Sequence, residues 1–188
     1  MAEMERASPQ PSVCAPLIAS AEMTDEPVSL ETVFRRYSRY VAAVAMRLLG
    51  RDDEVDDVVQ EVFLTAVRGM GQLREPAAVK GWLATVTVRV AGRRLRMRRL
   101  RGFFGLDARP GYEQIATADA PPDQRALLVR VYRLLDELPV NERLAWTLRH
   151  VEGEQLDAVA RSCGCSLATV KRRISAAQAR LDKALGSG

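Results

Sequence analysis

The chain has 188 residues, with 28 lysine and arginine side chains against 24 aspartate and glutamate side chains, a formal charge of +4 and a pI near 9.2. This length permits one ordinary domain or two small ones with thin cores, and excludes a large multidomain enzyme. The charge is uneven, since residues 1–88 carry 9 basic and 13 acidic side chains and residues 89–188 carry 19 and 11, so the second half is suited to a nucleic acid or an acidic protein.

Residues 1–27 contain four prolines and no sustained apolar period, which predicts a disordered tail. Met23 is an alternative start, because organised sequence begins just after it. The tail lacks the basic start and continuous apolar core of an export signal, and no stretch of the chain approaches the ~18 apolar residues of a membrane helix. We therefore expect a cytoplasmic protein that does not insert into a membrane.

Two amphipathic helices are expected next. Apolar residues recur every three or four positions from Leu30 to Leu48, and Gly50 ends this helix. The acidic run 52–57 suits the amino end of a second helix, because carboxylates there complement the helix dipole. Its predicted buried stripe is Val55, Val59, Val62 and Ala66, and Gly69 and Gly71 end it.

Pro76 is expected to open a further helix through Trp82. The following residues, 84–90, alternate apolar and polar side chains as a strand would, but they also fit helical spacing. We favour the helix, because a lone strand would have no partner in this chain. The segment continues into seven arginines without one acid, at positions 89, 93, 94, 96, 98, 99 and 101.

Residues 102–122 have the glycine and proline content of a linker. Beyond it, leucines and valines from Leu127 to Leu138 recur at helical spacing. Pro139 occupies a position that proline tolerates at a helix start, and a helix from there to His150 is expected to end near Gly153.

Residues 156–174 have the layout of a helix-turn-helix, with small Ala160 at the helix crossing and Gly164 at the turn. Ser166 is placed to cap the second helix. The internal packing positions are Val159, Val170 and Ile174. The second helix would expose Ala168, Thr169, Lys171, Arg172 and Ser175 toward a major groove, with Arg173 and Arg180 available to phosphates.

Cys163, Cys165 and the single histidine, His150, could be interpreted as three metal ligands. We favour core positions for the thiols, because a site with no fourth ligand nearby is poor zinc chemistry and both cysteines flank the turn glycine. No disulfide is expected from three cysteines without an export signal. His150 is expected on the surface near a helix end.

These motifs, in this order across a linker, resemble the extracytoplasmic-function (ECF) RNA polymerase sigma factors of the sigma-70 family. Residues 34–50 and 56–67 resemble region 2, and residues 138–160 with the helix-turn-helix resemble region 4. The resemblance implies an all-α protein of two small helical domains joined by a flexible linker. The implied organisation is a tail at 1–27, region 2 at 28–101, a linker at 102–123 and region 4 at 124–186.

The resemblance also implies partners and site residues. Core RNA polymerase, through its β′ clamp helices and β flap, promoter DNA and an anti-sigma factor are the implied partners. Core binding would fall to Asp56, Asp57, Gln60 and Glu61. Contact with the −10 element would fall to Arg74, Lys80, Trp82, Arg89, Arg93, Arg94 and Arg96, and the whole arginine run from Arg89 to Arg101 would grip promoter phosphates. Contact with the −35 element would fall to Ser166, Ala168, Thr169, Lys171, Arg172, Arg173 and Ser175.

Residues 69–80 would form the loop that takes a flipped base of the −10 element, which requires a pocket that offsets the cost of unstacking. Trp82 is equally consistent with a core position. The alternative function is an autonomous helix-turn-helix regulator that acts without core polymerase, although such a protein has little use for an acidic helix. A nucleic-acid-processing enzyme would need a carboxylate pair, a phosphate loop or a metal cluster, so we expect no catalytic residue, cofactor, metal or small-molecule substrate.

Overall fold

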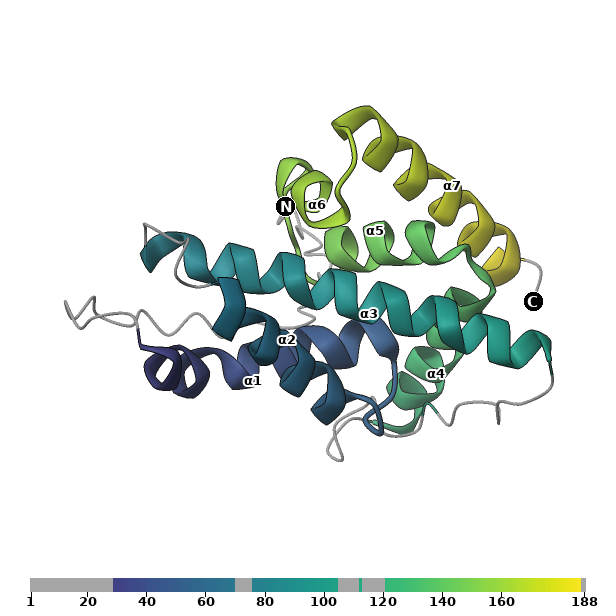
Figure 1. Ribbon diagram of the computed structural model, residues 1–188. Helices are drawn as coiled ribbons and strands as arrows, with labels where there is room; N and C mark the ends of the chain where they lie inside the picture. Colours follow the sequence, from purple (N-terminus) through teal and green to yellow (C-terminus); the bar gives the residue numbers. More distant parts are fainter. Residues whose placement is uncertain (1–28, 70–75, 105–111, 113–120, 187–188) are drawn as a thin grey trace, which may run out of the picture.

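The computed structural model describes residues 29–69, 76–104, 112 and 121–186 (Figure 1). These residues form seven α-helices, a short 3-10 turn and no strand, which confirms the expected all-α class. The elements are α1 Leu30–Leu49, α2 Val55–Gly69, η2 Pro76–Ala78, α3 Val79–Phe103, α4 Pro122–Glu137, α5 Val140–His150, α6 Leu156–Cys163 and α7 Leu167–Gly186. None of the described helices is both long enough and apolar enough to cross a membrane.

Helix α1 begins and ends where its sequence predicts. The Ser29 hydroxyl accepts a hydrogen bond from the backbone N–H of Thr32 at 3.1 Å, which caps the first turn. Gly50 adopts φ 73°, the left-handed conformation that ends a helix and that glycine adopts without strain. A Cβ at Gly50 would lie 2.6 Å from the Tyr132 ring, so this turn also needs glycine for space.

Helix α2 packs its apolar stripe against α1 and α3. Val55, Val62 and Ala66 of the predicted stripe are buried, as expected, whereas its fourth member, Val59, is only partly buried. The prediction missed two further buried residues, Val58 and Phe63; the Phe63 ring packs edge-on against Phe34 with centroids 4.8 Å apart. The buried surface of α2 is wider than a single apolar stripe, because α2 packs against both α1 and α3.

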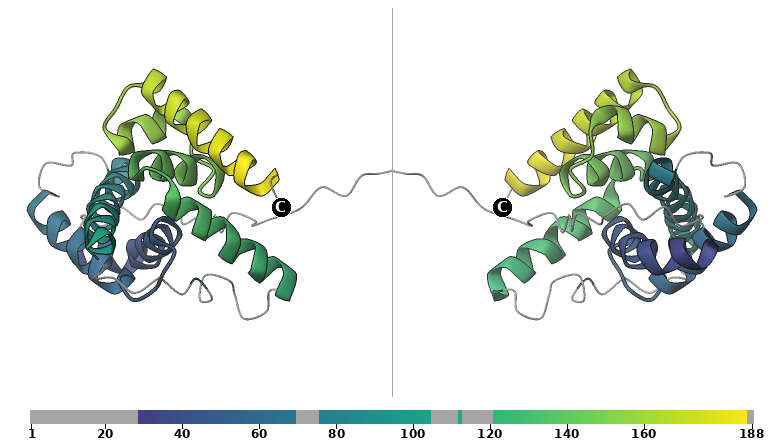
Figure 2. Two further views of the ribbon diagram at one scale, coloured as in Figure 1. Left: turned by 90° about the vertical axis from the view of Figure 1, so that its right-hand side faces the viewer. Right: turned by 90° about the vertical axis from the view of Figure 1, so that its left-hand side faces the viewer.

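Helix α3 is one continuous helix of 25 residues, which confirms the helical interpretation of residues 84–90. Val86, Val88 and Val90 are all buried although they point in different directions around the helix. Helices α1 and α2 cover one side of α3, and α5 and α6 cover the opposite side (Figures 1 and 2). Burial on two sides therefore produces the strand-like alternation in this sequence.

The segment between the two helical blocks is shorter than the sequence predicts, because α3 continues to Phe103 and α4 already begins at Pro122. The apolar residues of α4 are divided. Tyr132 and Leu135 are buried, whereas Leu127 and Leu128 are exposed. The helical period is correct for this segment, but only its carboxyl half is packed.

The two blocks share a hydrophobic core, in contrast to the separate thin cores that two small domains would have. Leu83 and Ala91 of α3 belong to the same buried cluster as Leu144 of α5 and Val159 and Val170 of the helix-turn-helix. A second, smaller cluster joins α4, α7 and Tyr112. The predicted tail at 1–27, Gly71, Arg74 and most of the predicted linker lie outside the described residues.

Candidate nucleic-acid interface

The predicted helix-turn-helix is formed by α6 and α7. Gly164 ends α6 with φ 61°, and the Ser166 hydroxyl accepts a hydrogen bond from the backbone N–H of Thr169 at 3.3 Å, which caps α7. Val159 and Val170 are fully buried between the helices, and Ile174 packs against the same cluster. The local sequence thus fixes the angle at which α7 leaves the turn.

The first turns of α7 present a polar face to solvent. The exposed members of the predicted reading set are Ser166, Ala168, Lys171, Arg172 and Ser175. Two cations, small side chains and hydroxyl groups on one exposed helix face are suited to base edges and phosphates in a major groove. Helices α5 and α6 lie between α7 and α3 (Figures 1 and 2), and these five residues are exposed, so packing of the two blocks leaves them accessible.

Two predicted members of the reading set are turned partly inward. The Thr169 hydroxyl lies 2.9 Å from the Ser166 hydroxyl, within the cap. The half-buried Arg173 guanidinium donates from Nη1 to Sγ of Cys165 at 3.2 Å. Arg180, predicted to be available to phosphates, is exposed but lies 3.4 Å from the Glu142 carboxylate. These contacts hold the helix-turn-helix together, so Lys171 and Arg172 are its outward-facing cations.

Both thiols are half-buried and pack against the core cluster, as the core interpretation predicts. Burial raises the pKa of Cys163 to about 11, so this thiol stays protonated at neutral pH. His150 is exposed at the end of α5, with its ring centroid 5.0 Å from that of Trp146. The pKa of His150 is lowered, first because part of the imidazole is shielded from water and second because Arg149 is positively charged. Among the described residues no group of three potential ligands is arranged to hold a metal.

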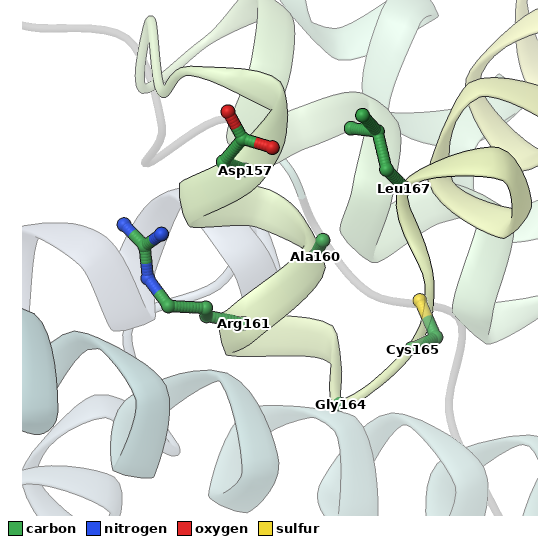
Figure 3. A pocket seen from close by; sticks show the side chains of 6 residues that line it. All are labelled: Asp157, Ala160, Arg161, Gly164, Cys165 and Leu167. Carbon is green, nitrogen blue, oxygen red and sulfur yellow. The ribbon is translucent and has the colours of Figure 1, made fainter.

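A shallow hollow lies beside the turn of the helix-turn-helix (Figure 3). Asp157 and Arg161 project from successive turns of α6, and Cys165 and Leu167 approach from the other side. Ala160 and Gly164 complete its lining. Asp157, Arg161 and Cys165 do not form a pair of a nucleophile and a general base in this hollow. The candidate functional site is therefore the outer surface of the helices.

The acids of α2 and the arginines of α3 meet one another, which the sequence did not predict. Asp57 lies 3.3 Å from Arg94, and Glu61 lies 3.7 Å from Arg94 and also pairs with Arg93. Asp56 and Gln60 are exposed. The acidic surface available to a partner is therefore centred on Asp56 and Gln60, while Asp57 and Glu61 neutralise two arginines.

Four arginines of α3, Arg89, Arg96, Arg99 and Arg101, are exposed and pair with no acid among the residues that the structure describes, although Arg99 donates to the Leu138 carbonyl at 3.2 Å. Lys80 is exposed too, with its ammonium 5.0 Å from the centroid of the Tyr40 ring. These cations form an open basic surface along α3 suited to a polyanion.

Trp82 is half-buried and packs against the core cluster. Its ring lies against Gly69, where an added Cβ would come within 2.7 Å of the indole. The same side chain therefore contributes to the core and stays partly exposed.

Arg98 corrects the prediction that the whole arginine run grips phosphates. The residue is only 7% exposed, and its guanidinium donates to the Leu49 carbonyl at 3.1 Å and lies 3.4 Å from the Glu54 carboxylate. Burial lowers the pKa of Arg98, and the nearby Glu54 carboxylate opposes part of this shift because it favours the charged guanidinium. A signal was present, since Arg98 continues the buried positions Thr87, Ala91 and Leu95 at intervals of four and three residues.

Comparison with known proteins places both blocks in one family. The model of sigma-70 region 2 matches residues 33–101, and the model of sigma-70 region 4 matches residues 128–181. The first match contains the α2 acids and the α3 arginines, and the second contains the helix-turn-helix.

Curated relatives match over most of their length. The RNA polymerase sigma-H factor of Pseudomonas aeruginosa is 30% identical, with 80% of this chain and 82% of that protein aligned. The ECF RNA polymerase sigma factor SigM of Mycobacterium tuberculosis is 29% identical, with 90% and 83% aligned. The fold resembles that of the sigma factor RpoE of Bartonella quintana, solved with the anti-sigma factor NepR, with a TM-score of 0.61, 22% identity, and 83% and 96% of the chains covered.

Proposed function

The chain belongs to the ECF RNA polymerase sigma factors of the sigma-70 family, and from this membership we propose which of its residues bind polymerase and read each promoter element. As a sigma factor it binds core RNA polymerase and directs it to promoters. The observation that carries the assignment of surfaces is that each kind of exposed group lies on a different helix, with exposed acids on α2, unpaired arginines on α3 and a polar reading face on α7. The protein acts in the cytoplasm with the polymerase and contributes no catalytic residue.

Core polymerase binds α2 through Asp56 and Gln60, with contributions from Asp57 and Glu61. The support is that Asp56 and Gln60 are exposed and lie in no ion pair of the described residues, whereas Asp57, also exposed, and Glu61 already pair with Arg94 and Arg93. The clamp helices of the β′ subunit are the proposed partner of this surface, and the β flap is the proposed partner of region 4. Charge reversal at Asp56 is therefore the sharper probe of this contact.

The −10 element is engaged by α3. Arg89 and Arg96 are suited to phosphates because they are exposed and unpaired in the described part of the chain. Lys80 and the accessible part of Trp82 lie at the amino end of the same helix, next to the segment that contains Arg74. Arg93 and Arg94 lie on the same helix, but their positive charge is partly neutralised by the ion pairs with Asp57 and Glu61 of α2.

The −35 element is read by α7 through Lys171 and Arg172, flanked by Ser166, Ala168 and Ser175. Thr169 and Arg173 position the helix through the cap and through Cys165. Region 2 extends over 28–101 and region 4 over 124–186, with the connection at 102–123. The helices support a slightly shorter connection between the two regions, because α3 ends at Phe103 and α4 begins at Pro122.

An anti-sigma factor controls the protein by covering these surfaces. The support is the resemblance in fold to RpoE of Bartonella quintana, which was solved with the anti-sigma factor NepR. A partner of this kind would have to cover basic and acidic faces together, since α3 and α2 carry opposite charges side by side.

Replacing Arg172 by alanine should weaken binding of the holoenzyme to its −35 element by about 1–3 kcal/mol, roughly 5- to 150-fold, and should relax the base preference at one position. The reason is that an arginine can pair with two acceptors of a guanine, which alanine cannot replace. The measurement is affinity for promoter fragments with each base at each −35 position. Arg133→Ala, which removes an exposed arginine from α4, is the matched control. Equal losses on every fragment would contradict base reading and indicate a phosphate contact.

A further inference from the structure

The carboxyl end of α1 is held by side chains from both helical blocks. The last carbonyls of a helix have no partner within the helix and must be satisfied elsewhere. Here the Leu49 carbonyl accepts from Nη1 of Arg98, in the same block, at 3.1 Å. The other donors come from the second block. Nε of Arg143 donates to the Leu48 carbonyl at 3.2 Å, and Nη2 of Arg143 donates to the Leu49 carbonyl at 2.9 Å.

Arg143 is the most enclosed of these donors, with 2% of its surface exposed. Its remaining nitrogen, Nη1, pairs with the Asp136 carboxylate. A buried guanidinium is tolerated only where its donors find acceptors, and the end of α1 supplies two of them together with the negative end of the helix dipole. Separating the blocks would leave Arg143 with Asp136 and water, would remove the Arg143 donor from the Leu48 carbonyl, and would leave the Leu49 carbonyl with Arg98 alone.

Two neighbouring contacts strengthen this junction. The Tyr132 hydroxyl donates to the Arg47 carbonyl at 3.0 Å, and burial raises the pKa of Tyr132 to about 12, so this donor persists across physiological pH. The Arg47 guanidinium also pairs with Glu152 of the second block, with Nη2 and Oε2 2.8 Å apart. Successive carbonyls of one helix end are thus bound by α4 and α5.

The apolar part of the junction depends on a glycine. Gly92 of α3 is buried, and a Cβ at this position would lie 2.9 Å from Cδ1 of Leu144 in α5. Gly92 therefore allows α3 and α5 to approach closely. Elsewhere on the same helix, an added Cβ at Gly102 would meet nothing within 4 Å.

This arrangement is too compact to reach two promoter elements at once. The −35 and −10 elements lie about 25 base pairs apart, roughly 85 Å of duplex at ~3.4 Å per base pair. A compact globule of this length has a radius of gyration of about 16 Å and spans roughly 45 Å. Moreover, α3 packs directly against α6, the first helix of the helix-turn-helix. The surfaces proposed for the two elements are therefore held close together.

We propose that this structure is a closed state of the protein, locked by Arg143 in the carboxyl end of α1, which must open before regions 2 and 4 can engage one promoter. Only the need to open for promoter binding rests on the proposed function. The latch follows from the contacts of Arg143, Tyr132 and Gly92.

The test is the distance between the blocks in the full-length protein in solution. Donor and acceptor dyes at Thr65 of α2 and Ala179 of α7, both exposed, would be attached through unnatural amino acids so that the native thiols are untouched. The unliganded protein should show one population with high energy transfer. Gly92→Leu, which inserts a side chain against Leu144, should lower the ratio of closed to open molecules at least tenfold.

Gly102→Leu is the matched control and should leave the ratio unchanged, because its side chain meets open space. Arg143→Met should act like Gly92→Leu, and circular dichroism would verify that both variants keep their helices. High energy transfer retained in both folded variants would overturn the latch. Low energy transfer in the unmodified protein would overturn the closed state.

Core polymerase and promoter DNA separate this inference from the proposed function. The unmodified protein should lose high energy transfer when it is part of a transcribing complex. A transcribing complex that keeps the closed distance would overturn the inference and leave the proposed function intact. A closed state that the variants open, in a protein that supports no transcription, would confirm the latch and contradict the proposed function.

Discussion

Replacing Asp56 by lysine should weaken binding of the protein to core RNA polymerase by about 30-fold or more, because reversing a charge in a close interfacial pair costs about 2–5 kcal/mol. Asp56 is exposed in the first turn of α2 and lies in no ion pair among the described residues, in contrast to Asp57, which lies 3.3 Å from Arg94. The same reversal at Asp57 would also disturb α3. Asp56 therefore tests the interface without testing the fold.

The measurement is a titration of the labelled protein with core polymerase, together with circular dichroism of the variant. Glu31→Lys is the matched control, since Glu31 is an exposed acid in the first turn of α1. Unchanged affinity of the Asp56 variant for core, with affinity lost instead in the Glu31 variant, would move the polymerase interface from α2 to α1.

Replacing Leu83 by alanine should lower the free energy of unfolding by about 2–5 kcal/mol, because the deletion leaves a cavity in the buried core. Leu83 is fully buried on α3, in the cluster that the two blocks share. For a chain of this size such a loss corresponds to a fall in melting temperature of roughly 5–15 °C. The expected consequence is weaker core and promoter binding on warming.

Thermal unfolding followed by circular dichroism measures this change. Leu64→Ala on α2 is the matched control, because Leu64 is 54% exposed and should change stability by no more than about 0.5 kcal/mol. Equal destabilisation by both substitutions would contradict the shared core and place part of the apolar packing on the outer side of α2.

The helices and the helix-turn-helix were predictable because their signals are local. Ser29, Gly50, Gly164 and Ser166 mark helix ends through cap and turn chemistry that involves only neighbouring residues. The period of apolar residues then fixes which side of α1 or α7 is buried. α3 was ambiguous for a physical reason, since a helix buried on two sides loses the one-sided pattern that identifies it.

The distribution of roles among the arginines was not predictable from composition. Arg89 and Arg98 belong to the same run, but Arg89 faces solvent while Arg98 is buried at the end of α1. The partners of Arg143, the Leu48 and Leu49 carbonyls, are backbone atoms almost a hundred residues away, and no side-chain pattern encodes them. Contacts of this kind depend on how the helices pack, so only the fold reveals them.

Run-off transcription on genomic promoter fragments, with core polymerase alone, the protein alone and both together, tests the central claim most directly. The account predicts specific transcripts only when both are present, with start sites that define a common −35 and −10 pair. Promoter-fragment binding by the protein alone that core polymerase does not strengthen, with no new transcript, would contradict it and indicate an autonomous helix-turn-helix regulator.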